Sequence, residues 1–287
     1  MRDRKPTQRR WLDRASRLLL ACLLWTAALG CKDPAPERAP RLATPTPAED
    51  HLVVFAAASL RDAFSALGES FERAHAGVEL TFNFAGTQEL RTQIEHGAAV
   101  DVFASADERH MSELARAGRV RAPRVFARNE PVVVVAKEQI GTLRAFSDLP
   151  HAQTIVIGAA QVPIGRYTRQ VLDRASVSLD PHFRANVEAR VVSHEPNVKQ
   201  VLVKVMLGEA DAAIVYRSDV NGTSRQVGVL AIPAEVNVIA EYPIAVVTEA
   251  AHPTLAREWV AFVLSDAGRA ALESAGFLTP AAATDRP

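Results

Sequence analysis

Cysteine is nearly absent from this sequence of 287 residues, which contains only Cys22 and Cys31. Metal sites built on thiolates and disulfide frameworks need cysteines, so neither is possible in the chain beyond residue 31. The shortage does not argue against export, because a core of this size is stable without disulfides.

The sequence also lacks an excess of charge of either sign, since 33 Lys and Arg residues balance 33 Asp and Glu residues. It shows no basic stripe, so we expect no nucleic-acid partner. It shows no internal repeat either. Hydrophobic residues make up 48% of the chain, enough for a buried core in one large domain or two modest ones.

The N-terminal segment reads as a targeting signal. Residues 1–17 are rich in Arg and Lys, and an apolar run over 18–30 follows. This run is shorter than the roughly 20 apolar residues that an ordinary membrane span needs. The pattern predicts a secretory signal peptide over residues 1–30, with a short membrane anchor as the alternative.

The apolar run ends in "AALGC", which resembles a bacterial lipobox, whose cysteine is acylated. Cys31 is therefore the expected lipid attachment site, although Ala28 stands where the pattern usually has leucine. A plain signal peptide cut nearby is the alternative. The Pro- and Ala-rich residues 31–50 predict an extended tether, and residues 281–287 a tail. We expect an exported body at the periplasmic face, held to a membrane by its lipid.

The body alternates between two kinds of hydrophobic pattern. Helical spacing and apolar runs predict helices over 59–75, 89–97, 108–118, 165–176, 197–207 and 253–275, and strands over 51–58, 77–85, 100–107, 130–138, 154–160, 189–194, 212–219, 227–233 and 241–249. This alternation predicts an α/β fold with mainly parallel sheets covered on both faces. Sites in such folds lie where strands end and helices begin.

Two of these helix starts carry a hydroxyl. Ser59 begins "SLRD", in which Asp62 completes a capping-box pattern. Thr87 follows Gly86 in "NFAGTQEL" and stands before a helical stretch. Taken singly, each hydroxyl is better explained as an ordinary N-cap.

Two further helix starts offer backbone N–H groups. In "VPIGRY", Pro163 stiffens the entry and Gly165 permits close backbone approach, while Arg166 either approaches a ligand or is solvated. In "EPNVKQ", Pro196 suits the first helical position, which points the N–H groups near Val198 outward. Each is also typical of a plain turn.

Together these helix starts predict an anion site. Free N–H groups and the positive end of the helix dipole favour a negative charge. Neutral hydroxyls could then hold a dianion without Arg or Lys. Tyr216, at the end of "AAIVY", offers a phenolic donor; a half-buried strand tyrosine is the alternative.

Residues 51–278 resemble the molybdate-binding proteins of bacterial ABC importers. The matching pieces, in order, are "VVFAAASL", "NFAGTQELRTQIEHGAAVDVFASAD", "PVVVVAK", "VPIGRY", "NVKQVLVKVMLGEADAAIVYRSD", "EYPIAVV" and "GRAALESAGF". The resemblance implies a type II periplasmic binding protein fold, with two α/β lobes of mixed, mainly parallel sheets and a ligand cleft at a hinge that the chain crosses twice. Lobe one would comprise 51–130 and 241–280, and lobe two 131–240.

The resemblance also implies which residues hold the oxyanion. Ser59 and Thr87 of lobe one would bind the oxyanion. From lobe two the binding residues would be Ile164, Val198 and Tyr216. The turn "FAGTQ" departs from the family's serine-rich turn, so Gly86 and Gln88 remain alternatives to Thr87. In "VPIG" an isoleucine is bulkier than the family's residue, but its backbone N–H remains available.

The family's ligand fits the neutral donors of this sequence. Molybdate carries no proton at neutral pH, so a site for it needs donors and no acceptor, and tungstate is nearly isosteric. We expect a monomeric binding protein that serves a membrane permease, with no cofactor, no protein-ligated cation and no catalysis. Sulfate, thiosulfate or another small anion is the alternative ligand.

Two other classes of protein have little support in the sequence. A hydrolase triad built on Ser59 would need a histidine and an acid, but there is no G-x-S-x-G elbow. No H-E-x-x-H pattern suggests a metalloenzyme. A ligand-sensing domain of a regulator is disfavoured by the signal peptide and by the missing DNA-binding segment.

Overall fold

The computed structural model describes residues 50–223 and 226–280. The predicted signal peptide, Cys31, the tether up to residue 49 and the tail at 281–287 lie outside the described residues. Within the described part, no helix combines the length and the apolar character that a membrane crossing requires.

The first of two five-stranded sheets in the described residues has the order β2-β1-β3-β10-β4. Its strands are β1 (Asp50–Ala57), β2 (Val78–Ala85), β3 (Val102–Ala104), β4 (Val120–Asn129) and β10 (Ala240–Val247). β1 pairs in parallel with β2 and β3, whereas β10 is antiparallel to β3 and β4. We call this sheet and its helices lobe one.

The second sheet has the order β7-β6-β8-β5-β9. Its strands are β5 (Pro131–Ala136), β6 (Ile155–Gly158), β7 (Val191–Glu195), β8 (Ala212–Tyr216) and β9 (Val227–Leu230). β6 is parallel to β7 and β8, and β5 is antiparallel to β8 and β9. We call this sheet and its helices lobe two, and the mixed α/β architecture predicted from the sequence is confirmed.

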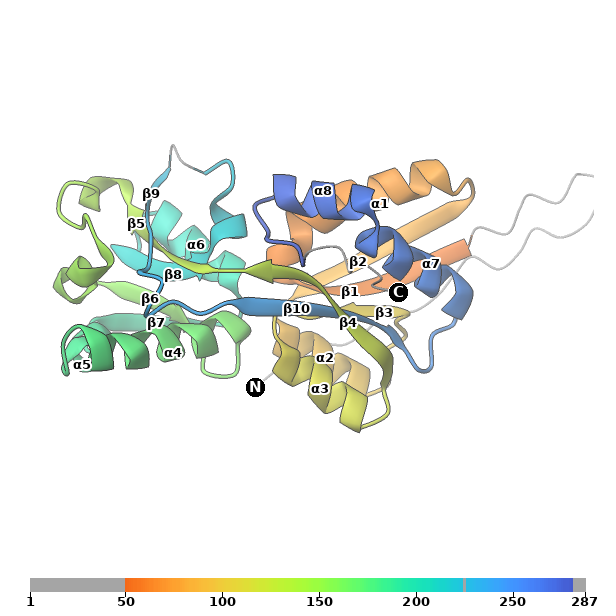
Figure 1. The fold of residues 1–287 in the computed structure, drawn as a ribbon, viewed down its shortest axis with the longest axis horizontal. Helices are drawn as coiled ribbons and strands as arrows, with labels where there is room; N and C mark the ends of the chain where they lie inside the picture. The colour runs from red at the N-terminus through yellow and green to blue at the C-terminus, as the bar shows by residue number, and fades with distance from the viewer. Residues whose placement is uncertain (1–49, 224–225, 281–287) are drawn as a thin grey trace, which may run out of the picture. The chain divides into compact units, whose positions relative to one another are not determined.

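The helices follow the strands in both lobes. Lobe one carries α1 (Arg61–Ala74), α2 (Thr87–Glu95), α3 (Glu108–Arg116), α7 (Pro253–Leu264) and α8 (Asp266–Ser274), and lobe two carries α4 (Pro163–Ser178), α5 (Phe183–Glu188) and α6 (Val198–Met206). Short 3₁₀ turns are η1 (Ala58–Leu60), η2 (Lys137–Gln139), η3 (Phe146–His151) and η4 (Arg217–Val220). In lobe one, α1, α7 and α8 lie on one face of the sheet, and α2 and α3 on the other (Figure 1).

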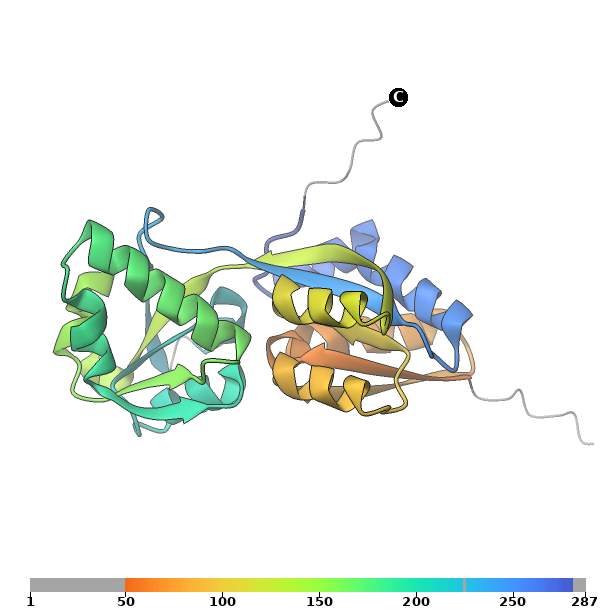
Figure 2. The same cartoon turned by 90° about the horizontal axis from the view of Figure 1, so that it is seen from below.

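Two segments connect the lobes. The chain leaves the first sheet between β4 and β5 and returns between β9 and β10. β4 and β10 run side by side in both views, joined by an antiparallel ladder with two register shifts (Figures 1 and 2). The crossings are therefore the short step at Glu130 and residues 231–239, next to the paired ends of β4 and β10.

The cores explain why these sequences form these elements. In lobe one, Trp259 of α7 is fully buried and packs edge-on against Phe64 and Phe71 of α1, at ring-centroid distances of 5.7 and 5.4 Å. In lobe two, every residue of β5 is buried, because β5 lies between two other strands and helices α4 and α6 pack on the sheet. An unbroken valine run suits such a strand.

Several predicted boundaries were wrong. The single helix over 253–275 is broken at Ser265, whose hydroxyl accepts the Gly268 N–H at 3.1 Å and caps α8. The strand over 100–107 shrinks to β3, because Ser105 and Asp107 form a hydrogen-bonded turn. Two elements were not predicted, β4, whose sequence is rich in arginine, and the short α5.

Candidate functional site

A small pocket lies where the carboxyl ends of strands from both sheets face each other. Its volume is about 220 Å³, including the space open to solvent at its mouth. Both lobes line it, through Ala57, Ala58, Ser59, Ala85, Gly86, Thr87, Ala106, Val162, Pro163, Ile164, Asn197, Val198 and Tyr216. The five residues predicted from the sequence are therefore brought together around one pocket.

Ser59 lies in η1 and is 4% exposed. Its Oγ is 3.0 Å from Tyr242 Oη, and α1 has Leu60 as its N-cap with no side-chain cap. The predicted capping box with Asp62 was wrong, because η1 precedes α1, Leu60 takes the N-cap position and the Ser59 hydroxyl bonds Tyr242 instead. Ser59 thus lines the pocket, and its hydroxyl is positioned by the hydrogen bond with Tyr242.

Thr87 is the first residue of α2, with Gly86 as the N-cap, so its predicted N-cap role was wrong. Its Oγ1 accepts a hydrogen bond from the Ala106 N–H at 3.2 Å. Gly86 has no room for a side chain, since a Cβ there would lie 2.4 Å from the Pro196 carbonyl oxygen. Gln88 donates its side-chain amide to that same carbonyl at 2.8 Å. Gly86 and Thr87 line the pocket, and Gln88 bridges to lobe two instead.

Ile164 is in the first turn of α4, after Val162 as N-cap and Pro163 at the first helical position. The N–H groups of a first turn have no acceptor within the helix. The expected close approach at Gly165 is confirmed, because a Cβ there would lie 2.1 Å from the Ala159 carbonyl oxygen. This packing fixes the start of α4 against the end of β6.

Val198 is the first residue of α6. Asn197 is the N-cap, and its side chain accepts the Gln200 N–H at 3.1 Å. Pro196 therefore precedes the cap, and its predicted place as the first helical residue was wrong. Because the asparagine satisfies a later N–H, the Val198 N–H has no acceptor within the helix.

Tyr216 ends β8 and is 1% exposed, so the half-buried alternative was wrong. Its Oη has no hydrogen-bond partner within the described residues. Burial raises the pKa of the Tyr216 phenol well above its ordinary value, so the hydroxyl keeps its proton at neutral pH. A buried polar group without a partner is costly, and a ligand in this pocket would satisfy it.

The side chains that line the pocket are uncharged, and the first turns of several helices face it. None of the described residues that line it carries a charged side chain. The first turns of α2, α4 and α6 all open onto it. Helix N-termini supply partial positive charge and free N–H donors, so the site suits an anion.

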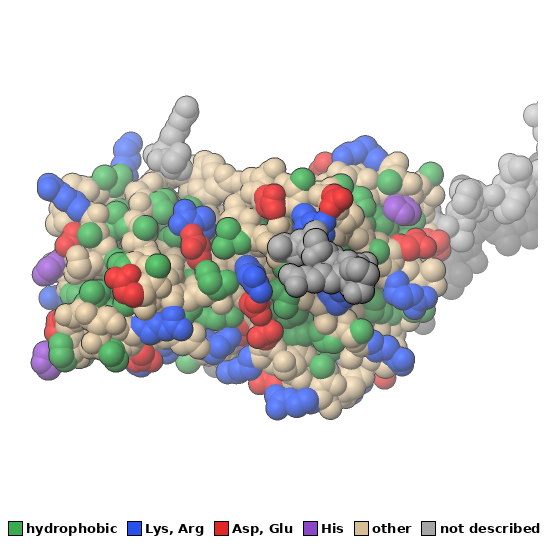
Figure 3. All heavy atoms as spheres, in the orientation of Figure 1, with side chains coloured by type: hydrophobic (Ala, Val, Ile, Leu, Met, Phe, Trp, Pro, Cys, Tyr) green, Lys and Arg blue, Asp and Glu red, His purple; other side chains and the backbone are tan. Residues whose placement is uncertain are grey.

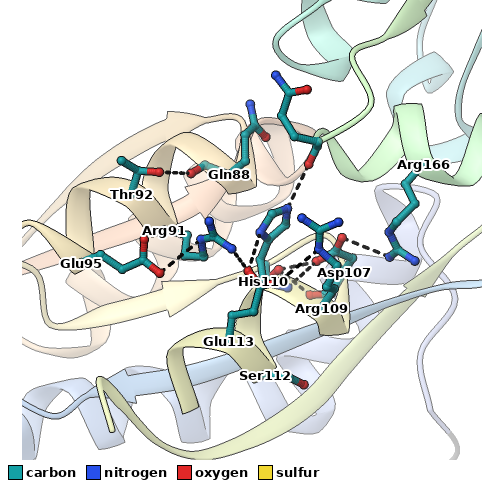
Figure 4. A network of polar contacts seen from close by, with 12 residues as sticks. Gln88, Arg91, Thr92, Glu95, Asp107, Arg109, His110, Ser112, Glu113 and Arg166 are labelled. Carbon is teal, nitrogen blue, oxygen red and sulfur yellow. Dashed lines mark hydrogen bonds and ion pairs between the residues drawn. The ribbon is translucent and has the colours of Figure 1, made fainter. Parts of the chain in front are cut away.

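A set of polar contacts beside the pocket was not predicted from the sequence (Figure 4). Arg166 of lobe two is not simply solvated, since its Nη2 lies 3.1 Å from Oδ2 of Asp107 in lobe one. His110 Nε2 lies 3.0 Å from the Gln161 carbonyl oxygen. These pairs join residues more than fifty positions apart, which sequence spacing does not reveal.

Other chemistries find little support. Among the described residues, no three His, Cys, Asp or Glu side chains lie close enough together to hold a metal ion. A hydrolase triad would place a histidine beside Ser59, but the Ser59 hydroxyl bonds Tyr242. His51 contacts Thr81, and His75 contacts the Phe71 carbonyl. On the face drawn in Figure 3, positive and negative side chains are interspersed.

The chain resembles known binding proteins. The family model described as "Bacterial extracellular solute-binding protein" matches residues 52–278. The molybdate-binding protein ModA of Mycobacterium tuberculosis is 38% identical over 273 residues, covering 94% of this chain and all of that protein. ModA of Escherichia coli is 29% identical, over 69% of this chain and 78% of its own.

A solved structure shares the fold. The periplasmic molybdate-binding protein of Azotobacter vinelandii superimposes with a TM-score of 0.70 at 21% sequence identity. The alignment covers 80% of this chain and 99% of that one. The two-lobed arrangement expected from the sequence resemblance is therefore that of a solved binding protein.

Proposed function

The chain belongs to the family of bacterial extracellular solute-binding proteins, and from this we propose that it captures molybdate outside the cytoplasm and delivers it to an ABC permease. The 38% identity to ModA of M. tuberculosis, over that protein's whole length, supports the choice of ligand. The observation that carries the proposal is the enclosed pocket, lined from both lobes and equipped with uncharged donors.

The donors proposed for the oxyanion are the Ser59 and Thr87 hydroxyls, the Ile164 and Val198 N–H groups and the Tyr216 phenol. The contacts behind the hydroxyls support this assignment. Thr87 Oγ1 already accepts the Ala106 N–H, which leaves its own hydrogen for a ligand. When Tyr242 donates to Ser59, the Ser59 hydrogen is free in the same way.

Such a site matches a fully deprotonated dianion. Each charge-assisted hydrogen bond contributes about 1.5–3 kcal/mol, so a handful holds the anion after the cost of ordering is met. Phosphate retains a proton near neutral pH and would need an acceptor, which the proposed donor set lacks. Tungstate has the charge and shape of molybdate and is expected to bind as well.

The remaining parts of the proposal concern the setting of the protein. We propose a monomer that works without a resident cofactor and without catalysis. Cys31, outside the described residues, is proposed as the lipid attachment site that keeps the body near its permease. Residues 31–50 would serve as the tether.

Calorimetric titration with molybdate, tungstate, sulfate and phosphate tests the proposal. We expect one-to-one binding of molybdate and tungstate, with much weaker binding of the other two. Ser59→Ala should weaken binding by about 1–3 kcal/mol, which is about 5- to 150-fold. Ser70→Ala is the matched control, because Ser70 donates to Ala66 within α1. Equal affinity for sulfate would overturn the choice of ligand.

A further inference from the structure

Among the polar contacts that join the two lobes in the described residues, four lie within a few residues of the pocket lining. Side chains of one lobe reach a carboxylate or a carbonyl of the other in the pairs Arg166–Asp107 at 3.1 Å, His110–Gln161 at 3.0 Å, Gln88–Pro196 at 2.8 Å and Lys199–Asp62 at 2.9 Å. A ligand in the pocket is enclosed, since the five proposed binding residues are each at most 4% exposed. Its release therefore requires the lobes to separate and these contacts to break.

Of the two ion pairs among these contacts, Arg166–Asp107 is the better shielded from water. The Asp107 side chain is 1% exposed and that of Arg166 is 28% exposed, whereas Asp62 is 75% exposed. Exposed pairs contribute little because solvent and salt screen them. The shielded pair is the stronger link, and the neighbouring Asp107 charge raises the pKa of the Arg166 guanidinium although its burial opposes this.

Asp107 is linked to the pocket on the lobe-one side, and Figure 4 shows its contact with Arg166. Its Oδ1 accepts the His110 N–H at 3.0 Å and caps α3, while its Oδ2 faces Arg166. The preceding residue, Ala106, donates its N–H to Thr87 Oγ1. The carboxylate is thereby fixed to the same turn that orients a proposed ligand hydroxyl.

Arg166 is tied to the pocket on the lobe-two side. It follows Ile164 by two residues in the first turn of α4, and its guanidinium also lies over the Tyr167 ring, 4.6 Å from the ring centroid. The Arg166 guanidinium is paired with Asp107, and Arg166 is not among the residues that line the pocket. The arginine next to the site is directed to the opposite lobe.

Resting on the proposed function, we propose that the Arg166–Asp107 ion pair is a latch between the lobes that sets the rate at which the bound oxyanion dissociates. Both are positioning residues, since neither lines the pocket. Breaking the pair destabilises the closed arrangement of the lobes and leaves the donors unchanged. The latch therefore acts equally on molybdate and tungstate.

Release of radiolabelled molybdate into excess unlabelled molybdate measures the dissociation rate. Arg166→Gln and Asp107→Asn each remove one charge, and an asparagine retains an oxygen that can cap α3. We expect each variant to release the anion about tenfold faster, corresponding to about 1.4 kcal/mol. The double variant should be no faster than the faster single one, because either change already removes the pair.

Arg184→Gln is the matched control. Arg184 pairs with Asp173 at 2.5 Å within lobe two, away from the pocket, and the variant should release molybdate at the wild-type rate. The ratio of molybdate to tungstate release rates should stay constant in all variants. Unchanged release in both single variants, or effects that add in the double variant, would overturn the latch.

A measurement without ligand separates the latch from the choice of substrate. Cys22 and Cys31 are first replaced by serine, and the exposed Ser65 of α1 and Val177 of α4 are replaced by cysteine (S65C, V177C) to carry spin labels. The distance between the two labels reports the separation of the lobes. Arg166→Gln and Asp107→Asn should shift this distance distribution to longer values, and Arg184→Gln should not. Identical distance distributions in the variants and the wild type would refute the latch. If the distribution shifts but the protein binds no molybdate, the latch is supported and only the proposed function is refuted.

Discussion

Tyr216→Phe removes a single buried oxygen, and its effects on affinity and on stability should differ. In the described structure the Tyr216 Oη bonds no protein group. Its loss therefore costs the folded chain no internal hydrogen bond, and the aromatic contacts with Tyr167 and Tyr242, at 6.4 and 5.8 Å, are retained. We expect the free energy of unfolding without ligand to be unchanged or slightly higher.

The same substitution should weaken binding of the anion. A hydrogen bond to a charged oxyanion contributes about 1.5–3 kcal/mol, so the dissociation constant should rise by about 10- to 150-fold. Calorimetry measures this rise, and chemical denaturation with and without molybdate measures the stability. The stabilisation by a fixed excess of molybdate should shrink by the same free energy.

Tyr242→Phe is the matched comparison, since Tyr242 is equally buried but bonds Ser59 at 3.0 Å. This variant should lose about 1 kcal/mol of unfolding free energy, because it breaks a protein–protein hydrogen bond. If Tyr216→Phe binds molybdate as tightly as wild type, Tyr216 is not a donor to the ligand. If it loses stability and affinity together, the phenol has a structural role and the reasoning fails.

Two further predictions concern packing and protonation. Gly165→Ala places a Cβ 2.1 Å from the Ala159 carbonyl oxygen, so it should lower the free energy of unfolding by about 1–3 kcal/mol in denaturation experiments; wild-type stability would show that α4 shifts freely. Burial raises the pKa of Asp219 to about 6, against the opposing effect of Lys199, so the folded protein holds this proton more tightly than the unfolded chain does. Its ionisation therefore destabilises the fold by about 3 kcal/mol above pH 6, and this cost disappears as the pH falls toward 4. Asp219→Asn should remove that pH dependence, and a wild-type pH profile of unfolding would contradict the prediction.

The positions that face the pocket were predictable because each stands where a strand ends or a helix begins. Ser59, Thr87, Ile164 and Val198 stand at such junctions, and Tyr216 ends a strand. Parallel strands bring their carboxyl ends to one edge of a sheet, so a local pattern carries this information. Element boundaries were less predictable, as Ser265 shows, because a single cap breaks a continuous helical periodicity.

The partners of these residues were decided by the tertiary structure. The sequence suggested that Ser59 caps its own helix, but its hydroxyl meets Tyr242, which lies 183 residues away in the chain. Arg166 read as a solvated side chain, but it meets Asp107 of the other lobe.

The sequence alone thus determined the α/β alternation, the helix starts and the neutral character of the donors, because these depend on local periodicity and residue type. Only the fold decided which groups the hydroxyls are hydrogen-bonded to, which phenol lacks a partner and which charges join the lobes. Those properties depend on contacts between distant segments, whose distances are set by how the two sheets and their connecting segments pack.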